Sequence, residues 1–339
     1  MLRSLSLCGS ILLALPLLAA DFEVVSLKRI WGEAPHSAFG DIIRFRDLWY
    51  CTFREGQTHA PSPAQAVDGK LRVITSEDGD TWKAVALIEE KGIDLRDPHL
   101  SITADGRLMI VAGGSKYPMG EYKGRQPRVI FSRDGTKWSK PQAVLEEGHW
   151  LWRVTWHKGK AYGVSKYGSP SKELAENPRR ANLVTSTDGV HWSTILELKV
   201  PGADETAVRF LPDDRMAVLM RRRTPTSESA FVGVSAPPYK QWQWTDTSIH
   251  VGGPNFVVLP DGTMIGGGRW SKQGGDGPHL GLGHMTASSY KPEFALPSGG
   301  DCSYPGFVYH DGLLWTMYYS SHEGKAQIYL AKIRVKGKS

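Results

Sequence analysis

Short runs of apolar residues alternate with tight polar turns from residue 21 to residue 335. Each turn joins two such runs, which is the pattern of a β-hairpin. The turns recur at Arg46-Asp47, Asp105-Gly106, Lys158-Gly159, Asp213-Asp214, Asp261-Gly262 and Asp311-Gly312. Their first residues are 59, 53, 55, 48 and 50 residues apart. A period near fifty, with about four short strands in each unit, is typical of a β-propeller.

The sequence therefore predicts an all-β fold, a six-bladed β-propeller that forms one domain over residues 21–339. The content of 37 Gly, 21 Pro and 12 Trp agrees with short strands joined by tight turns. We expect an N-terminal strand over residues 22–30 to join the last blade beside residues 328–333. Such a pairing closes the ring and removes an exposed sheet edge.

A shorter motif repeats inside this period. The pattern S-x-D-G-x-x-W occurs at residues 76–82, 132–138 and 186–192, with starts 56 and 54 residues apart. Each copy follows a strand-like run, over residues 71–75, 129–131 and 183–185. Asp-Gly is a strong turn signal because Gly adopts positive φ and Asp bonds to the turn backbone. Each copy therefore predicts a hairpin turn.

The first twenty residues have the character of a signal peptide. Arg3 supplies a positive charge, residues 11–18 form an apolar run, and Ala19-Ala20 offers a small-residue cleavage site before Asp21. The apolar run is shorter than the roughly 18 residues that a membrane span needs. We therefore expect an exported protein, periplasmic or extracellular, that has no membrane span and whose mature chain begins near Asp21.

Charge and cysteine content narrow the chemistry. Lys and Arg total 41 against 35 Asp and Glu, and this net charge of +6 is too small and dispersed to indicate a nucleic-acid partner. Cleavage leaves Cys51 and Cys302, too few for a disulfide framework or a four-cysteine zinc site. We expect the two to lie close together, because blades one and six adjoin in a closed ring; two separately buried cysteines are the alternative. The sequence predicts no metal or cofactor and indicates no oligomeric state.

The end of each hairpin that lies away from its turn can be located by counting eight residues forward and eight residues back from the turn. We call this end the rim. Two strands of equal length that leave one turn end at the same height, so both sets should share one rim. The outgoing strands place there Arg54, Gly113, Lys166, Arg221, Arg269 and Tyr319. The incoming strands place there Ala38, Asp97, Trp150, Glu205, Gly253 and Ser303, followed by Tyr304. If the hairpins are the inner strands, three arginines, two carboxylates and a tyrosine ring the mouth of the central channel.

The S-x-D-G-x-x-W segments resemble a one-residue-shorter form of the Asp-box of the sialidase (neuraminidase) superfamily. The resemblance covers most of residues 21–335 and implies a six-bladed propeller with the Asp-boxes on the face away from the active site. Residues 205–211, followed by Arg221, resemble the Glu-bearing strand of that family, and residues 304–308 resemble its nucleophile strand. Asp-boxes also occur in non-catalytic propellers, so activity depends on the other face.

The resemblance implies specific catalytic roles. Tyr304 would be the nucleophile and Glu205 its base, since a carboxylate nucleophile would be repelled by the carboxylate of the substrate. An arginine cluster would bind that carboxylate through charge-assisted hydrogen bonds. Arg221 and Arg269 match the second and third family arginines. The family's first arginine is absent, because Ser37-Ala38-Phe39-Gly40 stands in its place, and Arg54 is the nearest substitute.

Three residues are candidates for the general acid. Asp97 is assigned the role from its position at the rim, while Asp68 and His59 are the alternatives in the blade-one loop where the family carries its acid. The predicted function is an exported exo-glycosidase that releases terminal sialic acid or a related acidic sugar from glycoconjugates. The alternatives are a hydrolase or lyase for another acidic sugar and a non-catalytic glycan-binding propeller.

Overall fold

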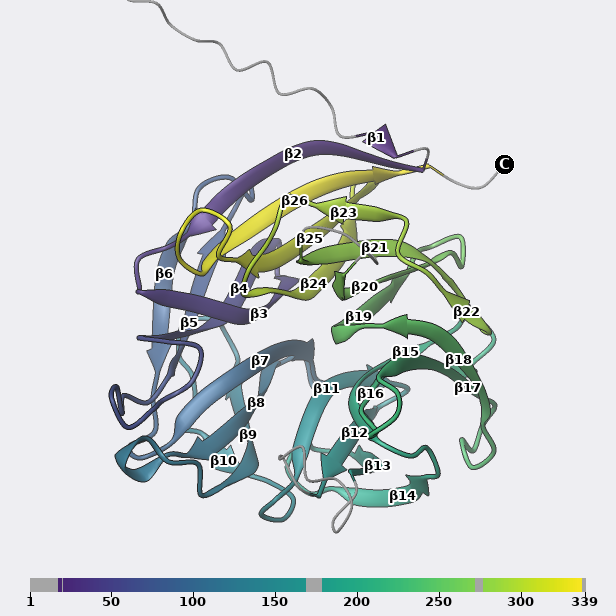
Figure 1. Ribbon diagram of the computed structural model, residues 1–339, viewed down its shortest axis with the longest axis horizontal. Helices are drawn as coiled ribbons and strands as arrows, with labels where there is room; N and C mark the ends of the chain where they lie inside the picture. The colour runs from purple at the N-terminus through teal and green to yellow at the C-terminus, as the bar shows by residue number, and fades with distance from the viewer. Residues whose placement is uncertain (1–17, 20, 169–178, 272–276, 337–339) are drawn as a thin grey trace, which may run out of the picture.

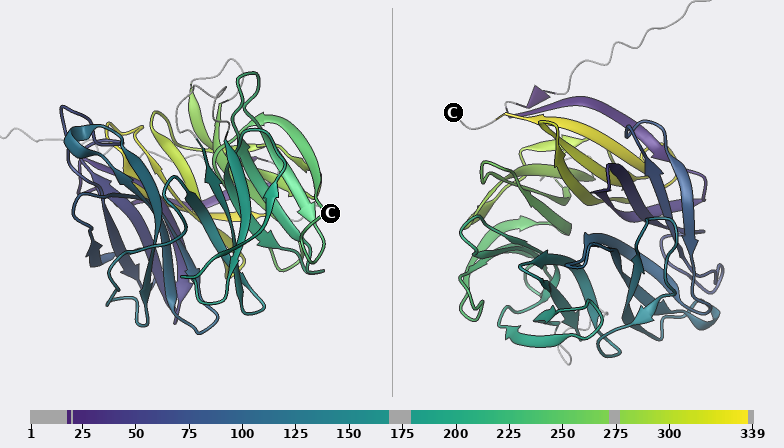
Figure 2. Two further views of the ribbon diagram at one scale, coloured as in Figure 1. Left: turned by 90° about the horizontal axis from the view of Figure 1, so that it is seen from below. Right: turned by 180° about the vertical axis from the view of Figure 1, so that it is seen from behind.

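The computed structural model describes residues 18–19, 21–168, 179–271 and 277–336. Within these ranges the strands form six antiparallel sheets that radiate around a central axis (Figure 1). A view from the side shows the sheets standing roughly side by side like blades (Figure 2). The predicted all-β, six-bladed propeller is confirmed.

The first three blades each contain four strands in simple meander order. Blade 1 consists of β3 (His36–Phe45), β4 (Leu48–Gly56), β5 (Lys70–Ser76) and β6 (Lys83–Ile88). Blade 2 consists of β7 (Asp94–Ile102), β8 (Leu108–Lys116), β9 (Gly124–Ser132) and β10 (Gln142–Ala143), with a short 3-10 turn at Pro118–Gly120. Blade 3 consists of β11 (Trp150–His157), β12 (Lys160–Tyr167), β13 (Arg180–Ser186) and β14 (Ser193–Leu198).

Blade 4 has the same four-stranded order, and only blades 5 and 6 differ at their outer edges. Blade 4 consists of β15 (Ala203–Phe210), β16 (Met216–Arg222), β17 (Ser229–Ser235) and β18 (Gln243–His250). Blade 5 consists of β19 (Gly252–Val258), β20 (Met264–Ser271), β21 (Pro278–Thr286), β22 (Ser289–Tyr290) and β23 (Phe294–Leu296). Blade 6 consists of β24 (Cys302–His310), β25 (Leu313–Ser320), β26 (Gln327–Val335), β2 (Phe22–Trp31) and β1 (Leu18–Ala19).

The N-terminal segment belongs to the last blade. Strand β2 pairs antiparallel with β26, so that Phe22 lies opposite Val335 and Trp31 opposite Ile328. This pairing places the two ends of the described chain on one blade, as the purple and yellow strands of Figure 1 show. Most of the predicted signal peptide, residues 1–17 and 20, lies outside the described residues, while Leu18–Ala19 pair with the start of β2.

The first strand of each blade lies innermost. Strands β3, β7, β11, β15, β19 and β24 contact one another in this order, and β24 returns to β3. Aromatic side chains fill the space between blades: the rings of Trp49 in β4 and Trp315 in β25 stack at 3.9 Å between blades 1 and 6. Burying such large apolar surfaces between neighbouring sheets is what holds the blades in a ring.

The three S-x-D-G-x-x-W segments form turns with the same hydrogen bonds. In the first, the N–H of Gly79 donates to Ser76 Oγ, and the N–H groups of Asp80 and Thr81 donate to Asp78 Oδ1. The indole Nε1 of the closing Trp donates to the glycine carbonyl in all three copies. These turns join the third and fourth strands of blades 1–3, at the same end as the hairpin turns between their first and second strands.

Every inner strand carries a β-bulge near its start. The pairing register slips by one residue at residues 39–40, 97–98, 152–153, 204–205, 253–254 and 304–305. Three of these positions hold an X-Pro pair, ending in Pro98, Pro254 and Pro305. Proline suits an unpaired bulge position because it has no N–H to donate. The bulges lie at the strand ends away from the hairpin turns and redirect side chains there.

Candidate functional site

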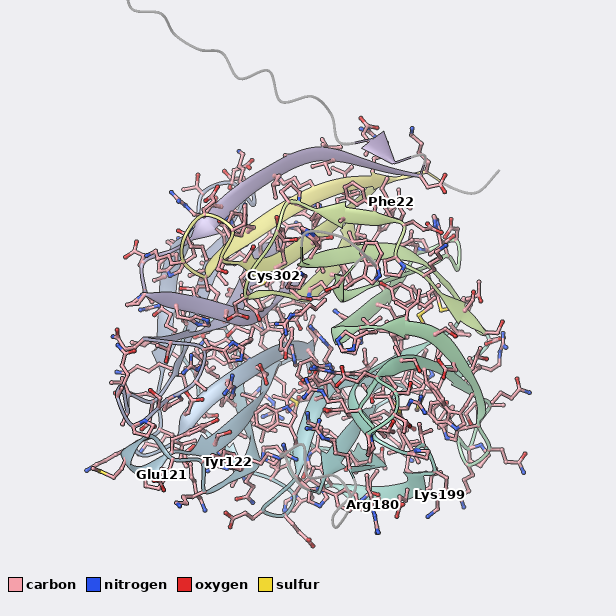
Figure 3. The ribbon with its side chains drawn as sticks, viewed as in Figure 1. Phe22, Glu121, Tyr122, Arg180, Lys199 and Cys302 are labelled. Carbon is pink, nitrogen blue, oxygen red and sulfur yellow. The ribbon has the colours of Figure 1, made fainter. Side chains whose placement is uncertain are left out.

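A cavity of about 510 Å³ opens at the bulge end of the inner strands, over the centre of the ring. Five of the predicted site residues line it: Asp97, Glu205, Tyr304, Arg221 and Arg269. Asp97, Glu205 and Tyr304 are all bulge residues, from blades 2, 4 and 6. Three bulges therefore bring together side chains that lie about one hundred residues apart along the chain. Nitrogen-bearing side chains gather over this part of the ring (Figure 3).

Tyr304 and Glu205 meet over the channel. The hydroxyl of Tyr304 donates to Glu205 Oε1 at 3.3 Å. The other carboxylate oxygen, Oε2, accepts from Arg221 Nη1 at 2.8 Å and from the N–H of Gly253 at 3.0 Å. Glu205 is thus held as a carboxylate acceptor directed at the tyrosine hydroxyl.

The charges around this pair keep the proton on the tyrosine. Burial by itself raises the pKa of Glu205, but the cations of Arg221 and Lys166 outweigh it and hold that pKa below its usual range. Burial, together with the negative charges of Glu205 and Asp97, raises the pKa of Tyr304. In the unliganded site Tyr304 is therefore a neutral donor and Glu205 an ionised acceptor.

The backbone of Tyr304 is fixed in an uncommon conformation. Its φ is +54°, in the left-handed region that non-glycine residues seldom occupy. The carbonyl of Pro305 accepts from Arg153 Nη2 and Asn255 Nδ2, both at 2.9 Å. A Cβ at Gly253 would lie 1.9 Å from the Tyr304 ring, so only glycine fits beside it. Buried polar groups of the channel thus hold the bulge that presents the hydroxyl.

Two arginines flank the tyrosine from blades 4 and 5. The guanidinium of Arg269 lies 5.5 Å from the centre of the Tyr304 ring and donates to Tyr319 Oη at 2.8 Å. Arg269 Nε also donates to the carbonyl of Cys302 at 2.9 Å. A Cβ placed at Gly252 would lie 3.7 Å from Arg221 Cζ and 3.3 Å from Arg269 Cβ. The guanidinium of Arg221 and the base of the Arg269 side chain therefore lie beside the same short segment of β19, and both side chains line the cavity.

The structure does not bring Arg54 to the cavity, so the predicted convergence of three arginines is wrong for this residue. Arg54 is completely buried, and its Nε and Nη2 donate to Asp94 Oδ1 at 2.9 and 2.7 Å. Its Nη1 donates to the carbonyl of Thr58 at 2.8 Å. The guanidinium of Arg54 is hydrogen-bonded to Asp94 of the neighbouring blade, in the protein interior, and so does not lie at the rim. Arg96 lines the cavity instead, with its guanidinium 4.9 Å from the centre of the Phe39 ring.

Of the three candidate acids, Asp97 and His59 line the cavity. Asp97 is 7% exposed, and among the described residues its Oδ1 has no hydrogen-bond partner. Burial raises the pKa of Asp97 to about 6, with Arg96 opposing the rise and Glu205 adding to it. Asp68 lies outside the cavity, beside the buried Arg54–Asp94 pair.

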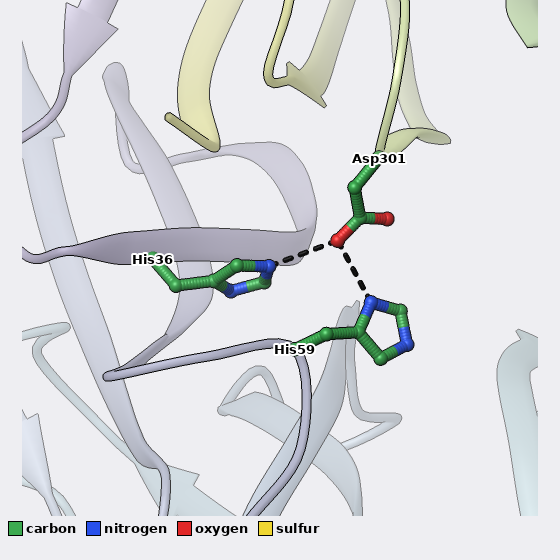
Figure 4. A group of neighbouring side chains, drawn as sticks. All are labelled: His36, His59 and Asp301. Carbon is green, nitrogen blue, oxygen red and sulfur yellow. Dashed lines mark hydrogen bonds and ion pairs between the residues drawn. The ribbon is translucent and has the colours of Figure 1, made fainter. Parts of the chain in front are cut away.

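His59 belongs to a separate hydrogen-bonded group at the edge of the cavity (Figure 4). Asp301 Oδ2 lies 2.7 Å from His59 Nδ1 and 2.9 Å from His36 Nε2. Burial lowers the pKa of His36 despite the contact with Asp301. Neutral His36 therefore donates from Nε2, and the carboxylate orients both rings.

Two groups in the described part of the chain offer metal-ligand atoms close enough together for one ion. One is the His36, His59 and Asp301 group, and the other combines Asp21, His284 and Glu293 outside the cavity. In the first, Arg269 Nη2 lies 3.5 Å from Asp301 Oδ1 and both histidines already bond to the carboxylate. A guanidinium so near favours a hydrogen-bonded cluster over a cation site.

The two cysteines do not form a disulfide. Cys51 is a buried free thiol in the core between blades 1 and 6, and burial raises its pKa well above the usual range. Cys302 is also free and buried, and its Sγ donates to the carbonyl of Pro278 at 3.4 Å. The structure therefore agrees with the alternative interpretation, in which the two cysteines are buried separately.

The cavity also holds residues to which the sequence analysis gave no role. They are Arg96, Ser115, Tyr117, Tyr122, Arg125, Arg179, Asp204 and Arg223. Arg96 and Asp204 each neighbour a predicted site residue at a bulge. The Asp97-Pro98 pair, eight residues before a hairpin turn, is a signal for the first of these bulges, whereas no proline marks the bulge at Asp204 and Glu205. Tyr117, Tyr122 and Arg125 lie in or beside the connection between β8 and β9, where no periodic pattern points to a site.

Solved structures with a similar fold include glycoside hydrolases. A protein of unknown function from Dyadobacter fermentans aligns with a TM-score of 0.78 at 18% identity, over 94% of this chain and 100% of that one. The GH93 alpha-L-arabinofuranosidase of Fusarium graminearum aligns with a TM-score of 0.66 at 17% identity, over 92% of this chain and 98% of that one. Trypanosoma rangeli sialidase aligns with a TM-score of 0.64 at 14% identity, over 93% of this chain.

The chain shares the six-bladed propeller fold of these glycosidases. It spans 60% of the length of the trypanosome sialidase. No family model and no curated protein matches the sequence. In the part of the chain that the structure describes, no helix is long and apolar enough to cross a membrane.

Proposed function

We propose that this chain is an exported glycoside hydrolase that releases a terminal acidic sugar, sialic acid or a relative of it, from glycoconjugates. The contact between Tyr304 and Glu205, flanked by Arg221 and Arg269, is the observation that carries the proposal. A neutral nucleophile beside two arginines suits a substrate whose carboxylate lies next to the reacting carbon. The fold shared with glycosidases supports the reaction class.

The proposed reaction proceeds in two displacements. Arg221 and Arg269 bind the substrate carboxylate, and the Tyr304 oxygen forms a bond to the anomeric carbon while its proton moves to Glu205. The bond to the leaving oxygen breaks, and Asp97 gives that oxygen its proton. In the second step Asp97 takes a proton from water, whose oxygen displaces Tyr304, and Glu205 returns the proton to the tyrosine. The sugar leaves with its original anomeric configuration.

Substrate binding also improves the base. Arg221 lowers the pKa of Glu205 in the empty site, through a hydrogen bond of 2.8 Å. A substrate carboxylate that shares the Arg221 guanidinium weakens that stabilisation, so the pKa of Glu205 rises when the acidic sugar is bound. Proton transfer from Tyr304 therefore becomes easier only in the complex.

The test is turnover of a panel of acidic glycosides by residues 21–339 and their variants. Tyr304→Phe and Glu205→Gln should each lower kcat by roughly 10³-fold or more, and the double variant should lose little beyond the worse single one. Tyr309→Phe, on the same strand but at its far end, is the matched control and should keep full activity. Undiminished turnover by Tyr304→Phe would refute the tyrosine mechanism.

The arginine role has a separate test. Arg269→Gln should weaken binding of the acidic sugar far more than binding of its methyl ester, because the lost contact is to the carboxylate. Equal losses for acid and ester would contradict the assignment.

A hydrolase or lyase for another acidic sugar is the second candidate, because Arg54 is held by Asp94 and Arg96 takes a place at the cavity. Mass spectrometry of the product separates these outcomes: hydrolysis adds water to the released sugar, whereas a lyase leaves a carbon–carbon double bond.

A further inference from the structure

The cavity has a second basic side, formed by blades 2 and 3, across the ring from blades 5 and 6, which carry Arg269 and Tyr304. Its centre is Trp150, the first residue of β11. The guanidinium of Arg125 lies 5.7 Å and the Nζ of Lys166 lies 5.8 Å from the Trp150 ring centre. A Cβ at Gly113 would lie 2.1 Å from the same ring, so the indole packs directly on the backbone of β8. We call these three side chains the Trp150 shelf.

Arg125 is a buried cation whose charge is not matched by a neighbouring acid. It is 9% exposed, and its Nε and Nη2 donate to the carbonyls of Gly148 and Gly168 at 3.1 and 3.4 Å. No carboxylate of the described residues lies within ion-pair distance of it. Burial lowers the pKa of Arg125, which means that the cation is partly desolvated at a cost. An anion bound in the cavity would offset this desolvation free energy by pairing with the guanidinium of Arg125.

The whole cavity carries an excess of positive charge. Among the described residues that line it, seven are Lys or Arg and three are Asp or Glu. The substrate carboxylate proposed above engages only Arg221 and Arg269, and Asp204 pairs with Lys166 and Arg179. One anionic group on the substrate therefore leaves Arg125 of the Trp150 shelf without a matching charge.

The shelf adjoins the reacting centre. Lys166 Nζ is 3.9 Å from Glu205 Oε1, so it adjoins the carboxylate that contacts Tyr304. The terminal sugar is held on the Arg221 and Arg269 side, so the shelf faces the part of the substrate that leaves. Trp150 is only 6% exposed and forms part of the cavity wall, and Tyr122, which is 38% exposed, lines the same cavity.

We infer that the Trp150 shelf binds a second anionic group, a carboxylate or sulfate on the sugar that precedes the terminal one. The substrate would then be an acidic oligosaccharide with charges on successive sugars, not a single acidic sugar on a neutral glycan. This inference rests on the proposed function, because it takes the Tyr304 side as the place of the terminal sugar. Arg125 supplies the oxyanion contact, and the Trp150 ring packs beside its guanidinium in the cavity wall.

Binding is measured in the Tyr304→Phe variant, so that turnover is not needed. The ligands are three disaccharides with one terminal acidic sugar, linked to galactose, to galacturonic acid or to galactose 6-sulfate. Calorimetry at low salt should show that at least one charged disaccharide binds roughly 10- to 100-fold more tightly than the neutral one. Comparing the galacturonic acid disaccharide with the galactose 6-sulfate disaccharide shows whether the bound oxyanion is a carboxylate or a sulfate. The preference should shrink as NaCl is raised.

Arg125→Gln in the same background should bring the ratio of charged to neutral affinity close to one, and Arg125→Lys should restore part of it. Arg133→Gln, just beyond the other end of β9, is the matched control and should leave the ratio unchanged. Thermal denaturation checks that each variant is folded. Equal affinity for all three disaccharides, or a preference that survives Arg125→Gln, would overturn the inference. Failure of the parent enzyme to cleave any acidic glycoside would instead refute the proposed function.

Discussion

Replacing Asp97 with Asn should change how the stability of the chain depends on pH. The pKa of Asp97 is raised from 3.8 to about 6, chiefly because the carboxyl is buried in the cavity wall. A shift of about two units corresponds to about 3 kcal/mol at 1.36 kcal/mol per unit. Only 7% of Asp97 is exposed, so solvent screening reduces this figure little.

The sign follows from proton binding. The folded chain holds the Asp97 proton more tightly than the unfolded chain, so the folded state is favoured at low pH. This stability is fully present below about pH 4 and is lost as the pH rises through about 6. Asn does not ionise, and Asp97→Asn therefore gains relative to the parent chain as the pH rises. The difference between their free energies of unfolding should increase by about 2 kcal/mol between pH 4 and pH 7, which is most of the full effect.

Urea unfolding of residues 21–339 at half-unit pH steps measures this difference. An offset that does not depend on pH, such as a change in packing at the substituted side chain, does not affect the slope. Asp311→Asn is the matched control, because Asp311 lies in an exposed hairpin turn with its side chain 82% exposed. A difference for Asp97→Asn that stays flat from pH 4 to pH 7 would refute the assignment of a buried, proton-holding carboxyl.

The same proton is the one that the proposed mechanism delivers to the leaving group. In the parent enzyme, kcat/KM for an alkyl glycoside should fall above about pH 6 as Asp97 ionises. Asp97→Asn should lose activity on alkyl glycosides and keep much more on aryl glycosides, whose leaving groups need no acid. If His59→Gln has this selective effect and Asp97→Asn does not, His59 is the acid.

Three further changes test the structure around the site. Gly253→Ala should lower kcat strongly in steady-state assays, because φ is +59° and the new Cβ would displace the Tyr304 ring; full activity would contradict this placement. Arg54→Ala should reduce the free energy of unfolding by about 3–5 kcal/mol in urea, since buried Asp94 loses its bidentate partner and keeps only Arg96 and the N–H of Gly69; unchanged stability with a raised KM would indicate that Arg54 binds substrate. Gly79→Ala should cost about 1–3 kcal/mol of stability without changing kcat, because the Cβ would strike a tryptophan ring of blade 6 far from the cavity.

The repeat and the hairpins could be read from the sequence because they depend on neighbouring residues. A turn such as Asp105-Gly106 has its own conformational preference, and its spacing from the next turn counts the strands between them. The S-x-D-G-x-x-W turns are equally local, since Asp78 bonds to N–H groups only two and three residues ahead. Counting along equal strands was also enough to bring Asp97, Glu205 and Tyr304 to one rim.

The composition of the cavity depended on contacts between blades, which no local pattern specifies. Counting assumed regular strands, but each inner strand contains a bulge, and the bulge aims Tyr304 at Glu205 across the channel. Arg54 had the correct height for the rim, yet the carboxylate of Asp94, forty residues further on, holds it in the interior. Arg125 reaches the cavity only because β9 lies beside the first strand of blade 3.

The sequence by itself thus determined the number of blades, the turn chemistry and the height of each strand end, because these follow from backbone preference and spacing. Tertiary structure decided which charges face the cavity and which neutralise one another inside the protein. The physical reason is that an arginine side chain is long enough to pair with any of several carboxylates or to remain in solvent. Which partner the guanidinium has depends on burial and on the three-dimensional position of the acids from other blades.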